Sequence, residues 1–444
     1  MRIKLILTLA MGLLSCGSAL AQKTASDRVI EFYQWRVSGD PEEYTNYDHL
    51  GSAYLQKARE SGDPVYYELS EKSYKGALGL LSEDKPEAAG TSAHLAALYL
   101  SEHRFEEALA LASKALALDP DLLSAYATRG DAQLETGKYD GAAISYAKLN
   151  VPEGSLPPRP GLGYLSETRQ ASRSYLVGRP QDAIEHMKAA IAEGREARLP
   201  KENIAWCQFS LGELYYGIGD FAGAETFYQT ALQTYPNYHR ALAWLGQLRA
   251  AQSRFAEAAD LYRKAIAIIP LPVYAAALGD IYTKMGESDA ARKEYGLVDF
   301  IAKLSALNQQ LFRRELASFY ADHDVHLGEA LHLAQSELQQ RQDVYTWDVL
   351  AWAYFKNGDT AEAAEAISHA LAQGTRDPMI FFHAGMIQYR AGDYEKARDF
   401  LKLALAINPH FHLRYADVAG QALEQLNSSP VPFGIPEETG DGLE

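Results

Sequence analysis

The most regular feature of the chain is a pattern of apolar and small residues that returns every 34 positions. Two consecutive stretches, LGELYYGIGDFAGAETFYQTALQTYP (211–236) and LGQLRAAQSRFAEAADLYRKAIAIIP (245–270), align without a gap. Within each stretch the apolar residues recur three and four positions apart, which is the spacing of one helical face. Each unit therefore predicts two antiparallel helices. The shared positions are Leu211/Leu245, Gly212/Gly246, Phe221/Phe255, Ala224/Ala258, Tyr228/Tyr262, Ala231/Ala265 and Pro236/Pro270.

Each shared position has a physical reason. Gly212 and Ala224 lack bulk, so the two helices of a unit can approach closely, and Tyr228 fills the space beyond them. Gly219 supplies the turn between the helices, because glycine adopts conformations that other residues avoid. Pro236 cannot continue a helix and helps to end the second one.

The same register can be followed from residue 45 to residue 410, over about ten units. Two units are degenerate: one has its second helix delayed to residues 66–78, and another is recognisable only by a second helix over 183–190. A single unit cannot bury its apolar face alone, so neighbouring units must stack. We therefore expect an all-α solenoid.

The segments outside the clear repeats complete the predicted organisation. The run VPEGSLPPRPGLG is rich in proline and glycine, which predicts a long loop or a hinge. The last residues combine prolines, glycines and acidic residues, which predicts a disordered tail. The expected segments are a leader (1–21), a leading helix (22–44), N-terminal repeats (45–150), the loop (151–164), the main solenoid (165–410), a capping helix (411–427) and the tail (428–444).

The 34-residue unit resembles the tetratricopeptide repeat, abbreviated TPR. The segments ARESGDPVYY, SYLVGRPQDAI, VLAWAYFKNGDTAEA and FHAGMI are also similar to a family of secreted bacterial TPR proteins without an assigned activity. The resemblance implies helical hairpins stacked into a right-handed superhelix. It also implies that partners bind along a concave face, lined by the first helix of each repeat.

Three repeats place large side chains at the positions that the resemblance assigns to this concave face. Large aromatic and methionine side chains are typical anchors for a bound peptide or helix. The alternative is that they pack on each other, on the capping helix or on the tail. These candidate groove residues are Trp206, Phe209, Glu213, Tyr216, Tyr345, Asp348, Trp352, Phe355, Met379, Phe382, Met386 and Tyr389.

Signals for catalysis are sparse. The chain has no HExxH, GxSxG, P-loop or CxxC motif. One polar cluster, Asp322, His323, Asp324 and His326, has the residue types of a divalent metal site, although a polar turn explains it as well. We therefore expect no enzyme activity and no cofactor. A metal-dependent enzyme using the 322–332 turn and a glycan-binding module remain the alternatives.

The first residues indicate where the protein acts. Arg2 and Lys4 precede a short apolar run and the small residues of Ala19-Leu20-Ala21, which is the layout of a secretory signal peptide. Leu13-Leu14-Ser15-Cys16 also resembles a bacterial lipobox, which makes Cys16 a lipidation candidate. The net charge of −16 disfavours nucleic acid and anionic lipid as partners. We expect a non-enzymatic scaffold or adaptor of the bacterial cell envelope that binds a protein or peptide segment, periplasmic or secreted, or alternatively a membrane-anchored lipoprotein.

Overall fold

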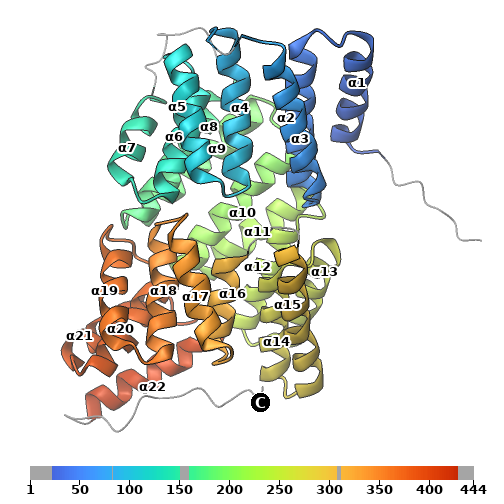
Figure 1. Ribbon diagram of the computed structural model, residues 1–444. Coiled ribbons are helices and arrows are strands. Elements are labelled where there is room, and N and C mark those ends of the chain that lie inside the picture. Colours follow the sequence, from blue (N-terminus) through green and yellow to red (C-terminus); the bar gives the residue numbers. More distant parts are fainter. Residues whose placement is uncertain (1–22, 83, 151–159, 308–311, 429–444) are drawn as a thin grey trace, which may run out of the picture.

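The fold consists of helices joined by short connections (Figure 1). The structure is a computed structural model that describes residues 23–82, 84–150, 160–307 and 312–428. These residues form 22 helices and no strand. Among the described helices, none is both long enough and apolar enough to cross a bilayer.

Ten pairs of antiparallel helices, which we number repeat 1 to repeat 10, stack between a leading helix α1 (Ala25–Gly39) and a final helix α22 (Tyr415–Ser428). The first helices of the ten repeats are α2 (Tyr44–Ser61), α4 (Glu87–Ser101), α6 (Leu123–Glu135), α8 (Leu162–Leu176), α10 (Lys201–Gly217), α12 (His239–Ala251), α14 (Pro272–Lys284), α16 (Arg313–Asp322), α18 (Val344–Asn357) and α20 (Pro378–Ala391). The second helices are α3 (Val65–Gly79), α5 (Phe105–Leu118), α7 (Tyr139–Ala147), α9 (Pro180–Glu196), α11 (Phe221–Thr234), α13 (Phe255–Ile268), α15 (Ser288–Leu307), α17 (Leu327–Leu338), α19 (Thr360–Leu371) and α21 (Tyr394–Ile407).

A glycine of the first helix and a tyrosine of the second pack together in five of the ten hairpins, as expected. A Cβ atom at Gly212 would lie 2.4 Å from Cε1 of Tyr228, so only glycine fits there. Tyr228 itself is fully buried. The same contact recurs at Gly51–Tyr74, Gly130–Tyr146, Gly246–Tyr262 and Gly279–Tyr295.

Some predicted boundaries shift. The final helix begins at Tyr415 rather than at Phe411, and residues 408–414 form a connection with turns at 409–410 and 413–414 instead. Residues 162–164, expected in the Pro/Gly-rich loop, form the first turn of α8. The predicted leader with Cys16, residues 151–159 of that loop and the tail from residue 429 lie outside the described residues.

The solenoid closes on itself, which the repeat pattern did not predict. In Figure 1 the blue and cyan helices α2–α7 lie above the orange helices α16–α21. The turn inside an early repeat contacts the connection that follows the repeat five places later. We call these contacts the lateral seam, formed by residues 62, 135–137, 176–178 and 216–219 against 269, 341–342, 374–375 and 407–410.

Three hydrogen bonds define the lateral seam. The carbonyl oxygen of Glu135 accepts a 2.8 Å hydrogen bond from the backbone N–H of Gln342. The Leu176 carbonyl accepts from the hydroxyl of Thr375. The Tyr216 carbonyl accepts a 2.8 Å bond from Nδ2 of Asn408.

All three acceptors belong to the last turn of a first helix, in α6, α8 and α10. The last four carbonyls of an α-helix have no partner within the helix. At Glu135 and Leu176 a remote connection therefore satisfies a backbone group at the helix end, whereas the Tyr216 carbonyl also accepts from the N–H of Gly219 at 2.9 Å.

Glycines with positive φ let the two sides of the seam approach closely. A Cβ atom would lie 2.8 Å from a backbone oxygen across the seam at Gly137 and at Gly219, and 2.3 Å away at Gly178. The turn glycines of later repeats, such as Gly358 and Gly392, also have positive φ but face open space. Glycine in the early turns is therefore required by the seam as well as by the backbone.

This contrast supplies a matched pair of variants. Gly178 and Gly392 have similar φ angles of 73° and 83°. Alanine at either position costs about 1 kcal/mol for the left-handed backbone. Only Gly178→Ala also places a methyl group against the Gly374 carbonyl, which we expect to add about 1–3 kcal/mol.

Urea denaturation followed by circular dichroism measures both costs, and small-angle scattering measures the radius of gyration. Gly178→Ala should unfold at lower urea than Gly392→Ala and have a larger radius. Equal midpoints and equal radii for the two variants would contradict the lateral seam.

Candidate functional site

The first helices of neighbouring repeats lie side by side, and we call the face that they form the concave face; α10, α18 and α20 carry the candidate groove residues. Eight of the twelve are buried within the chain. These are Phe209, Tyr216, Asp348, Trp352, Phe355, Phe382, Met386 and Tyr389. The other four, Trp206, Glu213, Tyr345 and Met379, are half-buried.

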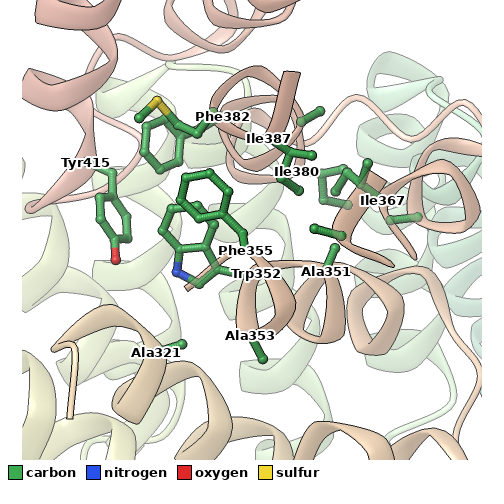
Figure 2. Packing of buried hydrophobic residues seen from close by; sticks show 14 of the residues in the cluster. Ala321, Ala351, Trp352, Ala353, Phe355, Ile367, Ile380, Phe382, Ile387 and Tyr415 are labelled. Carbon is green, nitrogen blue, oxygen red and sulfur yellow. The ribbon is translucent and has the colours of Figure 1, made fainter. Parts of the chain in front are cut away.

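The buried aromatics of α18 and α20 form a single packed cluster with the start of α22 (Figure 2). Trp352 stacks on Phe355 with ring centroids 4.7 Å apart, and Phe382 stacks on Tyr415 at 4.8 Å. The Tyr415 ring also meets Trp352 edge-on at 5.5 Å. These side chains therefore pack on each other and on the capping helix, as the alternative to a peptide-binding role stated.

The α10 residues meet the far end of the chain. The Tyr216 hydroxyl donates a 3.0 Å hydrogen bond to the carbonyl of His410, 194 residues away. Phe209 packs among Tyr228, Tyr238 and Trp244 in a separate cluster. The two ends of the predicted groove are thus joined by the connection between α21 and α22.

That connection, residues 408–414, crosses the concave face. Phe411 lies with its ring 5.6 Å from that of Phe382 in repeat 10. Leu413 packs against the cluster formed by repeats 6 and 7. The connection therefore makes apolar contacts with repeats that are distant in sequence.

A buried ionic cluster lies beneath the end of this connection. Nη1 of Arg414 donates a 3.1 Å hydrogen bond to Oδ1 of Asp280, and Nη2 donates to the carbonyl oxygen of Asp322 at 3.2 Å. Oδ1 of Asp322 accepts from the Tyr415 hydroxyl at 2.8 Å and from the Trp352 indole at 2.9 Å. The concave face thus presents two carboxylates to one arginine and one tyrosine.

The electrostatics of Asp280 follow from its neighbours. Burial alone would raise the pKa of this carboxyl, but His323 and Arg414 outweigh burial and hold the pKa well below its usual range. Nε2 of His323 lies 2.8 Å from Oδ1 of Asp280. Asp280 is therefore a charged acceptor in a region that holds little water.

The predicted metal cluster is divided between two environments. Asp322 and His323 face the ionic cluster, whereas Asp324 pairs with Nζ of Lys356 at 2.8 Å on the surface. The His326 ring lies against Tyr320. Among the described residues, no group of three or more histidine, cysteine, aspartate or glutamate side chains has metal-binding geometry. The structure thus does not bring the four residues together as one donor set.

Sequence reasoning missed Asp280, Arg414 and Tyr415. Asp280 occupies position nine of its repeat, which is a concave position, so its charge was a usable signal. Arg414 lies in a connection without periodicity, and its partners lie 92 and 134 residues away. No local pattern could have identified it.

Glu213 generates a test of the electrostatics of the concave face. Burial raises the pKa of this carboxyl to about 8, and the charge of Arg240 offsets only part of the effect. Above the ordinary pKa of a glutamate, the Glu213 carboxyl therefore keeps its proton in the native state and releases it in the unfolded state. The stability linked to this proton is present below about pH 4.5 and is lost as pH rises towards 8.

Glu213→Gln removes this titration. Its melting temperature should exceed that of wild type by an amount that grows from pH 5 to pH 8. Glu365→Gln, in the exposed part of α19, is the control and should show no such growth. A difference between Glu213→Gln and wild type that does not change with pH would argue against the assignment.

Comparisons with known proteins address the family. Sequence profiles described as "Tetratricopeptide repeat" match residues 95–153, 209–271 and 349–410, and a second profile of that description matches residues 174–237. No curated protein matches the chain.

Solved structures of similar fold share little sequence. A tetratricopeptide repeat protein from Parabacteroides merdae is 16% identical, with 60% of this chain and 100% of that chain covered, at a TM-score of 0.34. The type IV pilus biogenesis factor PilW is 18% identical over 50% of this chain and 95% of its own, at 0.39. Yeast Tom70 is 14% identical over 87% and 98%, at 0.32. The repeat profiles, together with the stacked helical hairpins, show that the chain belongs to the tetratricopeptide repeat family.

Proposed function

We propose that this protein is an adaptor of the bacterial cell envelope that holds a segment of another protein on its concave face. Its fold is a scaffold typical of protein–protein interaction, and tetratricopeptide repeat proteins are in general non-enzymatic. The observation that carries the proposal is the connection 408–414. Concave side chains from several repeats already hold this non-helical stretch through aromatic, apolar and charged contacts.

Access to the concave face is greatest at the four half-buried candidates. Trp206 and Glu213 lie on α10, Tyr345 on α18 and Met379 on α20. An indole, a phenol and a thioether give large contact areas to a peptide, and Glu213 adds a titratable acceptor. We expect a partner to make its first contacts there, because the remaining candidates are covered.

Site-specific photo-crosslinking tests the proposal. A photoreactive phenylalanine analogue replaces Trp206 on the concave side or Ile144 on α7, a second helix, where the side chain is 63% exposed. In living bacteria the Trp206 position should yield discrete crosslinked proteins that the Ile144 position does not. The same products at both positions, or none at Trp206 and Tyr345, would remove the support for concave binding.

The envelope location has its own test. The order of charge, apolar run and small residues in 1–21 supports export with cleavage after Ala21. The mass of the protein isolated from cell fractions should then correspond to a chain that begins at Gln22. A mass that corresponds to an acylated chain beginning at Cys16, lost in Cys16→Ala, would establish the lipoprotein alternative. An unprocessed chain in the cytoplasm would refute export.

A further inference from the structure

The connection between α21 and α22 is longer than the turns between Leu118 and Leu123 or between Ile268 and Pro272. After Ile407 it runs as Asn-Pro-His-Phe-His-Leu-Arg and enters α22 at Tyr415. We call residues 408–415 the internal segment.

The internal segment contacts repeats from both halves of the main solenoid. Its first residues bind Tyr216 of repeat 5, and Leu413 packs on repeats 6 and 7. Arg414 reaches Asp280 of repeat 7 and Asp322 of repeat 8. Tyr415 contacts Trp352 of repeat 9 and Phe382 of repeat 10. A peptide segment bound by the concave face would make contacts of this kind.

The charged contact is better suited to recognition than to stability. Arg414 is 5% exposed, and the desolvation of a buried guanidinium and its carboxylate largely cancels their attraction. Apolar residues of the same volume would stabilise a capping connection at least as well. An arginine held by two acceptors instead discriminates strongly against a segment that lacks it.

The acceptors are held by residues of the repeats as well as by the internal segment. The Tyr295 hydroxyl donates to Oδ1 of Asp280 at 2.9 Å, and His323 lies against the same oxygen at 2.8 Å. Oδ1 of Asp322 accepts from both the Trp352 indole and the Tyr415 hydroxyl. Each carboxylate therefore has at least one partner that does not belong to the internal segment.

From these contacts we infer that the internal segment is an intramolecular ligand of the concave face, and that the partner it stands in for is a polypeptide segment carrying arginine followed by an aromatic residue. This inference rests on the proposed adaptor function. The covalent link gives the internal segment a high effective concentration, so it competes with any external peptide. A partner of the same chemistry binds by displacing it.

The test uses a fluorescent peptide of residues 408–416, NPHFHLRYA, and the full mature chain. Arg414→Gln weakens the internal segment mildly, and Phe411→Ala/Arg414→Gln weakens it further while leaving the groove residues unchanged. Helical circular dichroism confirms folding. Peptide affinity, measured by fluorescence anisotropy, should rise from wild type to the single variant to the double variant, with about tenfold or more between the extremes.

Two controls assign the binding to the site. Asp280→Asn added to the double variant should reduce peptide affinity about tenfold or more, since it removes a charged acceptor. Asp260→Asn on the exposed face of α13 should not. A peptide with glutamine in place of its arginine should bind the double variant weakly.

The inference fails if affinity does not increase in that order, if no variant binds the peptide, or if the glutamine peptide binds as well as the arginine peptide. Discrete crosslinks at Trp206 without peptide binding would overturn this inference and leave the proposed function standing. Peptide binding that follows the predicted order without any crosslinked partner would support this inference and remove the support for the proposed function.

Discussion

The structure depends most on hydrogen bonds that carbonyl oxygens at helix ends accept from donors far away in the chain. A stack of helical hairpins leaves the last carbonyls of every first helix without partners in the helix. In repeats 3, 4 and 5 the connections after repeats 8, 9 and 10 supply a donor. The same spacing of five repeats recurs at each contact. Because of this spacing the solenoid is a closed coil, in which the inter-helix turns of early repeats contact the connections that follow late repeats.

The closed coil explains the burial of the concave aromatics. Large side chains on the inside of an open solenoid would face water, which is unfavourable for Trp352 or Phe382. Closure brings the 408–414 connection and α22 over them, and the covering residues include charged groups with matched acceptors. The surface that we propose for partner binding therefore also stabilises the fold, and a partner bound there would compete with the chain itself.

The fold was largely readable from the sequence because the repeat is local. The contact between Gly212 and Tyr228 spans sixteen residues and recurs at fixed spacing, so pattern alone predicts it. The lateral seam was not readable, because it depends on the small rotation between neighbouring repeats, added over five of them. Gly178 and Gly392 look equivalent in sequence, yet only the first meets another part of the backbone. Arg414 was missed for the same reason, whereas Trp352 and Phe382 were singled out by the register together with the resemblance.

The order of the seam partners along the chain has a consequence for biosynthesis. The three carbonyl acceptors that define the seam are synthesised before their donors, since Glu135, Leu176 and Tyr216 precede Gln342, Thr375 and Asn408. Repeats near the N-terminus can stack as they emerge, because their contacts are local. The carbonyls of Glu135 and Leu176 can bond only to water until the last repeats arrive. The coil can therefore close only after the C-terminal helices have been synthesised. A prematurely terminated chain would remain an open spiral with its inner aromatic surface uncovered.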